Sequence, residues 1–163
     1  MAWIVEVGYK KEATDPVGFL TKKEIEDLGI EGVKDVRTIN TYIIDGDISE
    51  DDVKKICEEL LSDSQIQHFG YSDENVKKLI TEHGFPEAWL VEVTFKPGVT
   101  DAVGLSTLNA IEIMGIDGVR NVSTGEKYLI FGDVSEEDVE KICKRILANE
   151  LIQNYSYRKI GGK

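Results

Sequence analysis

The residue types that could carry catalysis or bind a metal are few in this chain of 163 residues, which has two cysteines and two histidines. Cys57 and Cys143 stand in apolar helical patterns, where a free cysteine usually packs as a small buried hydrophobe. His68 and His83 have no cysteine or second histidine at the spacing of metal ligands, so neither a zinc site nor a histidine base is expected. We therefore predict no catalytic, cofactor-binding or metal-binding residue.

A carboxylate-rich stretch at 45–52 is the other candidate for metal chemistry. A calcium loop needs alternating oxygen ligands over about twelve residues. Here Ser49 is a good helix N-cap, so a helix would interrupt such a loop. We interpret the stretch as a turn followed by acidic residues at the positive end of a helix.

An internal repeat organises the elements that hold these residues. Residues 2–71 align without a gap with residues 88–157, and 34 of the 70 aligned positions are identical. Agreement at this level indicates a duplication. The sequence therefore predicts unit 1 at 1–71, a linker with a short helix at 72–87, unit 2 at 88–158 and a tail at 159–163.

Each unit shows the same order of predicted elements. In unit 1 the patterns predict strands at 3–9, 33–36, 42–44 and 66–71, and helices at 16–28 and from Ser49 through Leu61. The two middle strands are short and flank a polar turn near Asn40, which predicts a hairpin. This β-α-β-β-α-β order predicts an α+β fold, with a ferredoxin-like sheet and both helices on one face.

The two units are expected to pack together as an intramolecular pseudo-dimer. A unit of about 70 residues buries only a small core by itself. Ile4 and Leu90 are apolar on the strand face opposite Trp3 and Trp89, where a solvated sheet would be polar. We therefore expect the second face of the sheet to be covered as well.

The charge of the chain limits its partners. The net charge is -12 and the pI is about 4.6, which argues against nucleic acid or an anionic membrane as a partner. Residues 1–71 carry -8 of this charge and residues 88–163 only -2. The sequence has no apolar run of membrane-spanning length and no signal-peptide pattern, so we expect a cytoplasmic protein.

The second unit resembles the PurS family, the small subunit of phosphoribosylformylglycinamidine synthase. The resemblance is carried by an ordered pattern: Lys96-Pro97-Gly98-Val99 with Asp101 and Gly104, the stretch 115–122, and the ending Leu147-Ala148-Asn149 followed by Ile152 to Tyr155. Unit 1 keeps most of this pattern but has Lys11-Glu12-Ala13 in place of Pro-Gly-Val. The pattern occurs twice, in order, and covers most of the chain.

This resemblance implies a non-catalytic assembly subunit in de novo purine biosynthesis. Its partners would be the large synthetase subunit and the glutaminase subunit, which it would bridge. The complex uses ATP, Mg and glutamine, whereas no cofactor and no activity are implied for this chain alone. Family members are usually single units that dimerise, so this chain would be a covalent dimer with specialised surfaces. Which unit contacts which partner, and whether chains associate further, are left open.

The candidate partner contacts lie in the loop after the first strand of unit 2 and in its predicted hairpin. They are Lys96, Pro97, Gly98, Asp101, Gly125 and Lys127. A backbone bulge at Gly98 could approach a partner closely. Turn formation alone also explains why proline and glycine stand there.

Two other functions fit the predicted order of elements. An amino acid sensor of the ACT type would bind its ligand between the units and has a Pro-Gly turn like that at 97–98, although unit 1 lacks this turn. An acylphosphatase-like enzyme would need an arginine in a glycine-rich phosphate cradle after the first strand. Neither unit has that cradle.

Overall fold

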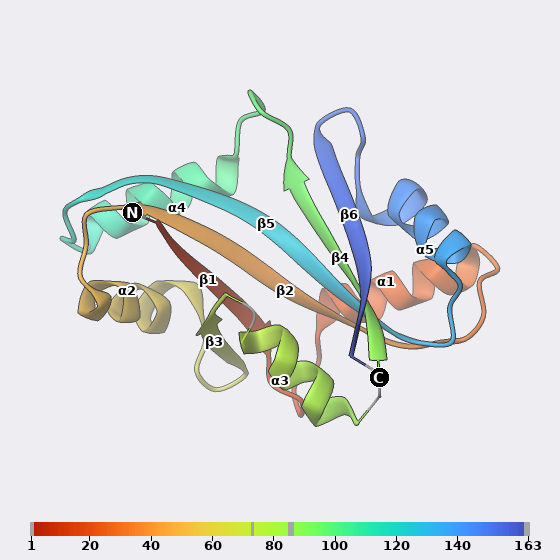
Figure 1. Ribbon diagram of the computed structural model, residues 1–163. Helices are drawn as coiled ribbons and strands as arrows, with labels where there is room; N and C mark the ends of the chain where they lie inside the picture. The colour runs from red at the N-terminus through yellow and green to blue at the C-terminus, as the bar shows by residue number, and fades with distance from the viewer. Residues whose placement is uncertain (1, 73, 85–86, 162–163) are drawn as a thin grey trace.

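The computed structural model describes residues 2–72, 74–84 and 87–161, which form a twisted sheet with helices on both faces (Figure 1). The strands are β1 (Ala2–Tyr9), β2 (Val33–Gly46), β3 (Gln67–Tyr71), β4 (Glu87–Phe95), β5 (Val119–Gly132) and β6 (Gln153–Gly161). The helices are α1 (Pro16–Asp27), α2 (Glu50–Ile56), α3 (Glu74–His83), α4 (Ala102–Ile113) and α5 (Glu136–Ile142). The π-helical segments η1 (Cys57–Leu61) and η2 (Cys143–Leu147) continue α2 and α5.

Four helices begin at the capping residues that the sequence indicates. The Asp15 carboxylate accepts a hydrogen bond from the Gly18 amide at 2.9 Å, and Asp101 does the same for Gly104. The hydroxyls of Ser49 and Ser135 accept from the amides three residues on, each at 3.1 Å. These contacts satisfy amides that have no partner within the first turn of a helix.

The two units share one antiparallel sheet. Its strand order is β3-β1-β2-β5-β4-β6, so the long strands β2 and β5 meet at the centre and join the units. The α+β class and the pseudo-dimer are therefore confirmed. The tail expected from residue 159 begins later, because β6 extends to Gly161 and pairs there with Glu87 of β4.

The predicted hairpin within each unit needs a correction. The residues expected to form its two strands are extended, but no turn separates them, and they are the two halves of one 14-residue strand. The strand continues because the other unit supplies hydrogen-bond partners along its whole length: β2 pairs with β5 from Val33 to Gly46. A turn at Asn40 would leave those backbone groups without partners.

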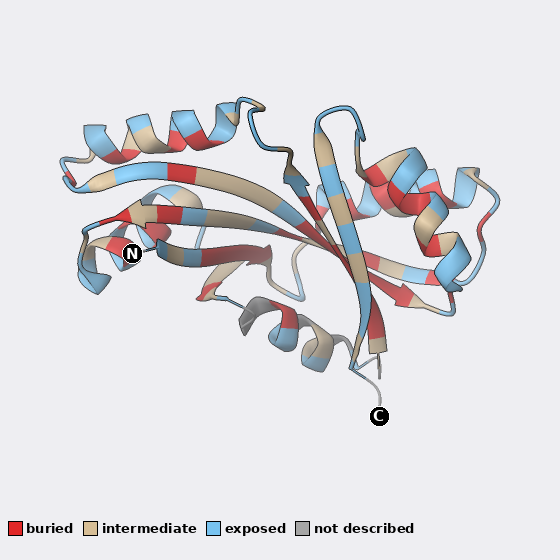
Figure 2. Ribbon diagram, turned by 45° about the horizontal axis from the view of Figure 1, so that its top comes forward, coloured by how far each residue is buried: buried red, intermediate tan, exposed pale blue. Residues whose placement is uncertain are grey.

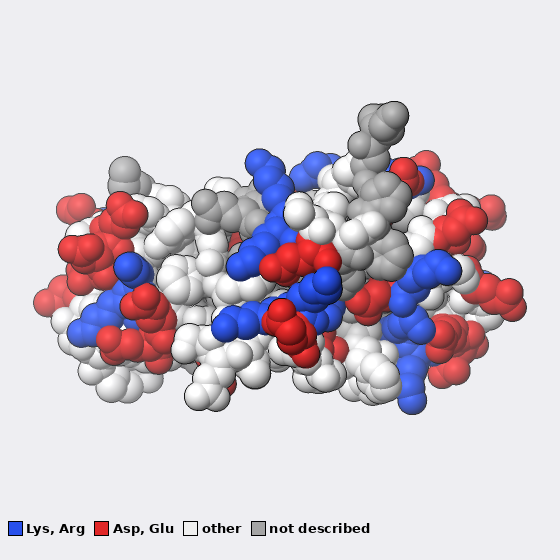
Figure 3. All heavy atoms as spheres, turned by 90° about the horizontal axis from the view of Figure 1, so that it is seen from below, with Lys and Arg blue, Asp and Glu red and all other residues white. Residues whose placement is uncertain are grey.

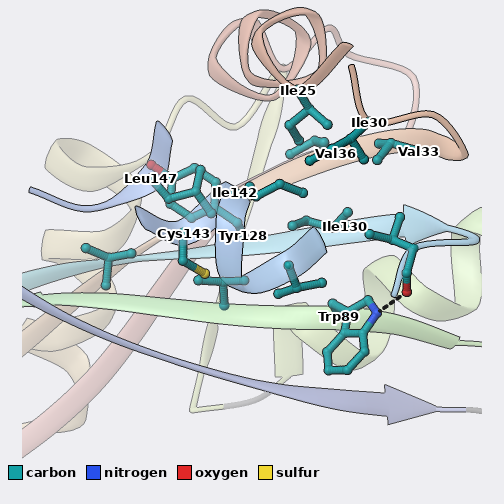
Figure 4. Packing of buried hydrophobic residues seen from close by; sticks show 14 residues of the cluster. Ile25, Ile30, Val33, Val36, Trp89, Tyr128, Ile130, Ile142, Cys143 and Leu147 are labelled. Atoms are coloured by element: carbon teal, nitrogen blue, oxygen red, sulfur yellow. Dashed lines mark hydrogen bonds between the residues drawn. The ribbon is translucent and has the colours of Figure 1, made fainter. Parts of the chain in front are cut away.

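Each of the two main cores draws side chains from both units. One core packs Ile25 of α1 together with Ile142 of α5, as Figure 4 shows. The other packs Ile56 of α2 together with Ile111 of α4. The first helix of each unit therefore lies at the same end of the sheet as the second helix of the other unit (Figure 1). Because neither core is complete within one unit, the two units depend on each other for stability.

The opposite face of the sheet carries a third, smaller core under α3. Val76 of α3 packs there against Leu90, Leu129 and Phe131, and Figure 2 shows buried positions on the inner side of this helix. Leu90 is 0% exposed, but its equivalent Ile4 is 42% exposed. The expectation that the second face is covered is therefore confirmed for unit 2 and only half met in unit 1.

Candidate partner-docking site

The loop between β4 and α4 projects into solvent at its tip. The Lys96 amide donates to the Ile152 carbonyl at 2.8 Å, and the Val99 amide donates to the Lys96 carbonyl at 3.1 Å, which closes a tight turn. Pro97 and Gly98 at the tip are exposed. Gly98 has a φ of +87°, a conformation that favours glycine, and a side chain there would meet open space. The tip is thus shaped by its backbone and open to a partner.

Asp101 fastens the start of α4 to the central strand. Besides capping Gly104, its carboxylate accepts from the Thr124 amide at 2.6 Å and from the Thr124 hydroxyl at 2.9 Å. Asp101 is therefore fully engaged within the chain. Its part in any docking would be to fix the position of the loop and of α4.

Gly104 allows α4 to lie close to the sheet. A Cβ atom at this position would stand 2.2 Å from the Val122 carbonyl oxygen, far inside a van der Waals contact. Gly18 has the same relation to Val36 in unit 1, at 2.1 Å. The close approach explains why both helices carry glycine at this point in their first turn.

The outward face of α4 exposes several apolar side chains, beside the polar Ser106, Asn109 and Glu112. Only one charged residue, Glu112, occurs among its 12 residues. Val103, Leu105 and Ile113 are largely exposed, and Ile113 is 79% exposed. A shallow groove of about 350 Å³ lies beside them, lined by Leu60, Ala102, Val103, Ser106, Thr107 and Ala110. An apolar helix face of this kind is typical of a surface that another protein covers.

A pocket of about 310 Å³ opens next to the start of α4, between the two units. Its walls include Tyr42 of unit 1 and Phe95, Val103, Gly125 and Glu126 of unit 2. Burial raises the pKa of the Tyr42 phenol, so this group is a neutral hydrogen-bonding partner near neutral pH. The pocket joins the loop, the helix and the central strands into one surface.

The structure brings only part of the predicted contact set together. Gly125 lines this pocket, whereas the loop residues 96–101 do not line it and lie in the chain between two residues that do, Phe95 and Val103. Gly125 and Lys127 belong to the continuous strand β5 and not to a hairpin turn. The Lys127 side chain is buried and forms an ion pair with the buried carboxylate of Glu6 from unit 1.

The cysteines have the surroundings that the sequence indicates. Cys57 and Cys143 are buried in the two main cores, and burial raises the pKa of each thiol to about 12. Neither is a reactive thiolate near neutral pH. In the described part of the chain, no group of three or more histidine, cysteine or carboxylate side chains could hold a metal ion. No helix of that part is long and apolar enough to cross a membrane.

Sequence reasoning missed the exposed face of α4. The apolar positions of this helix were interpreted as a core stripe, although only Thr107, Ile111 and Gly104 are buried. The signal was available in the sequence, because the equivalent helix α1 has five charged residues where α4 has one. A helix without a charged side is either buried by its own chain or covered by another.

Comparison with known proteins finds the same family twice in this chain. The model of the PurS family, described as phosphoribosylformylglycinamidine (FGAM) synthase, matches residues 2–75 and 89–161. The chain is similar to the phosphoribosylformylglycinamidine synthase subunit PurS of Archaeoglobus fulgidus, with 34% identity over 71 residues, 40% of this chain and 89% of the relative. The subunit PurS of Methanocaldococcus jannaschii is 32% identical over 73 residues, 42% of this chain and 88% of the relative.

A solved structure is also similar. It is the crystal structure of Methanocaldococcus jannaschii PurS, described as one of the subunits of formylglycinamide ribonucleotide amidotransferase in the purine biosynthetic pathway. The two share 26% identity over 47% of this chain and 99% of that one, with a TM-score of 0.38. Residues 76–88, which include most of α3, fall between the two segments that match the family.

Proposed function

The chain belongs to the PurS family, and we propose that it is an assembly subunit that holds the synthetase and glutaminase subunits of phosphoribosylformylglycinamidine synthase together. Two complete family units in one chain support this role. They supply in one polypeptide the pair of surfaces that a dimer of single units would otherwise provide. We further propose the division into unit 1 (1–71), linker (72–87) and unit 2 (88–158).

The observation that carries the proposal is a pair of equivalent apolar surfaces at opposite ends of the molecule (Figure 1). Val17 and Phe19 are exposed in the first turn of α1, and Val103 and Leu105 are exposed in the first turn of α4. Exposed apolar clusters on a folded chain mark protein interfaces. A molecule with one such surface at each end can hold two partners at a fixed separation.

In this role the chain fixes the positions of its partner subunits and takes no part in the chemical reaction. Ammonia released from glutamine must reach the synthetase site without escaping to water, and a fixed arrangement of subunits favours that transfer. ATP, Mg and glutamine would bind to the partner subunits, and we propose that this chain has no activity alone. We place the complex in the cytoplasm.

We retain the loop residues Lys96, Pro97 and Gly98 as proposed partner contacts, now together with the exposed face of α4. Asp101 would act through the hydrogen bonds that hold this loop and helix. Gly125 would act through the pocket that it lines. Lys127 would act from inside the sheet, since its ammonium group faces Glu6 and not the solvent.

Reconstitution tests the proposal directly. The full chain is mixed with the matching synthetase and glutaminase subunits, and the mixture is separated by size-exclusion chromatography and assayed for formation of the amidine product. We expect all three chains to elute together and glutamine-dependent synthesis to require this chain. Synthesis from added ammonium, which bypasses the glutaminase, serves as the control. Equal glutamine-dependent activity with and without the chain, and no joint elution, would refute the assignment.

The amino acid sensor is disfavoured by the pocket between the units. A cation is the strongest partner for the α-carboxylate of an amino acid ligand. The residues that line the pocket include no lysine or arginine, and the charged one among them is the Glu126 carboxylate. Calorimetry with free amino acids would reveal micromolar binding if the sensor function were correct.

A further inference from the structure

A second open groove lies on the face of the sheet that carries α3. It has a volume of about 490 Å³ and runs between α3 and the last residues of β6. Val76, Ile80 and Ile160 give it an apolar floor, and Lys77 and Arg158 stand at its edges. Val76 is buried, whereas the two basic side chains are exposed.

The groove lies between α3 and the end of β6, and these two parts of the chain have no equivalent arrangement in unit 1. Most of α3 lies outside the segments that match the family. The equivalent of β3 (Gln67–Tyr71) is 153–157, yet β6 continues to Gly161, and these additional residues form one wall of the groove. In unit 1, β3 ends at Tyr71 and α3 begins at Glu74. The groove therefore has no counterpart at the other edge of the sheet.

Its charge is opposite to that of the whole molecule. The chain has a net charge of -12, but Lys77 and Arg158 make no ion pair with any residue in the described part of the chain. Figure 3 shows several basic side chains in the middle of the underside, with a few acidic ones among them, whereas acidic side chains predominate towards both ends. An acidic segment would be attracted to the middle and repelled from the ends.

The backbone of β6 adds a third element of recognition. The strand lies at the edge of the sheet and pairs only with β4. It is nine residues long, against five in β3 at the opposite edge. A free edge of this length presents unpaired amides and carbonyls to which an extended segment can add as a further strand.

We propose that this groove binds an extended acidic segment of a partner polypeptide, which adds as a strand to the free edge of β6. Alternate side chains of an added strand point to the same face. On the face that meets the groove, carboxylates and apolar side chains would therefore occur by turns at every second residue; the carboxylates would meet Lys77 and Arg158, and the apolar residues would lie on Ile80 and Ile160. This docking surface goes beyond the assembly role proposed above, since it requires neither α4 nor the loop at Lys96.

A designed peptide probe tests the proposal on the full chain. The probe is a fluorescein-labelled peptide of about ten residues, a usual strand length, in which every second position is by turns glutamate and valine and the positions between them are threonine, so that both glutamate and valine face the groove. Its affinity is measured by fluorescence anisotropy for the wild type and for the double variant Lys77→Glu/Arg158→Glu. We expect about tenfold weaker binding to the variant, because two ion pairs are lost. The matched control is Lys11→Glu/Lys34→Glu, which makes the same charge change at two exposed lysines of unit 1 and should bind as the wild type does.

Hydrogen exchange distinguishes strand addition from general attraction between charges. The bound glutamate–valine peptide should slow amide exchange within 153–161 and leave 67–71 unaffected. Equal affinity of the wild type and the double variant would overturn the proposal, as would an absence of protection in β6. A third outcome would also refute the proposal: the wild type does not bind the peptide, and the double variant self-associates. The basic residues would then only prevent the edge strand from pairing with another chain. None of these outcomes bears on joint elution with the synthetase.

Discussion

The helices α1 and α4 occupy equivalent places in the two units but present different surfaces. Their inner positions are the same: Gly18 and Gly104 touch the sheet, and Ile25 and Ile111 are fully buried. Both also expose apolar residues in the first turn. They differ in the last two turns, where α1 carries lysine, glutamate and aspartate and α4 carries leucine, asparagine, alanine and isoleucine.

This difference shows what duplication within one chain permits. In a dimer of identical units, one surface must serve both ends, because a substitution appears in both copies. Here the inner residues are held in common by packing, while the outer ones are free to diverge. The charged end of α1 can remain in water, but the apolar end of α4 favours self-association when it is exposed to water. We infer that α4 carries the larger interface.

Exchange of the outer residues between the two helices would have the largest effect. The variant Asn109→Lys/Ile113→Asp gives α4 the residues that α1 has at these positions, Lys23 and Asp27. We expect the affinity for the partner subunit bound at α4 to fall by about 30-fold or more, as when an interface hot spot of about 2 kcal/mol is lost. Surface plasmon resonance with each immobilised partner subunit measures this change.

The reverse exchange on α1 is the matched control. Asp27→Ile, the reverse of Ile113→Asp, should leave the affinity of both partners within about twofold, because Asp27 lies in the charged last turn of α1 and not in its exposed apolar first turn. The melting temperature should remain nearly constant in both variants, since Ile113 is 79% exposed. If the α4 variant binds as well as the α1 variant does, the two helices do not differ in function.

The sheet face that carries α3 also differs between the two units. Ile4 pairs with Ile43 in unit 1, and Leu90 pairs with Leu129 in unit 2. The leucines are fully buried near α3, but the isoleucines are still partly exposed. One linker helix therefore covers one half of a face that is apolar in both units.

The ion pair between Lys127 and Glu6 joins the two halves of this face, and its loss should have the next largest effect. Thr41 stands in unit 1 where unit 2 has Lys127, so the pair exists on one side only. Replacement of Lys127 by methionine leaves the fully buried Glu6 carboxylate without this cation. We expect the free energy of unfolding to fall by about 3 kcal/mol, measured by urea denaturation.

A second substitution separates the charge from the packing at this site. In Glu6→Gln/Lys127→Met the buried charge is absent, and most of the lost stability should return. Thr41→Val, at the equivalent position of unit 1, should change stability by less than about 1 kcal/mol. A loss in the double variant as large as that in Lys127→Met would show that the ammonium stem, and not its charge, stabilises this face.

The repeat and the periodicity of the sequence allowed much of the fold to be predicted. Capping by Asp15 and Asp101, the burial of Cys57 and Cys143, and the pairing of the units could all be inferred from local patterns. The joining of two strands into one could not. The stretch at Thr124-Gly125 has turn-forming residues, and its extended state depends on hydrogen bonds from β2, which is nearly 90 residues away in the chain.

The candidate site was predicted less well, for a related reason. The loop at 96–98 was found because proline and glycine signal a turn. The pocket forms where helices lie over a sheet made by both units. A local sequence pattern does not predict how far each helix extends over that sheet. Lys127 was predicted as a partner contact because it stands in the predicted hairpin, but its side chain is buried and its partner Glu6 lies 121 residues away in the sequence.

The smallest effect concerns Glu140, which has no counterpart in unit 1. Its carboxylate accepts hydrogen bonds from the hydroxyls of Tyr155 and Tyr157, the latter at 2.7 Å. Unit 1 has Lys54 and Phe69 at the positions of Glu140 and Tyr155. The hydrogen bond to Glu140 raises the pKa of Tyr157 to about 12 and also raises that of Tyr155. The hydrogen bonds from these hydroxyls lower the pKa of the Glu140 carboxyl, and the bond from Tyr155 has the larger effect.

The pH range in which these hydrogen bonds stabilise the fold follows from the directions of the phenol and carboxyl pKa shifts. A raised phenol pKa gives stability that is present below the ordinary value of about 10 and is lost as the pH rises towards about 12. A lowered carboxyl pKa gives stability that is present above about 4.3 and is lost as the pH falls below that value. In Glu140→Gln, ultraviolet titration should show two phenols ionising at lower pH than in the wild type, whereas Lys54→Gln should leave the titration unchanged. An unchanged titration of Glu140→Gln would mean that the carboxylate does not hold these hydroxyls, and this difference between the two units would then be one of sequence alone.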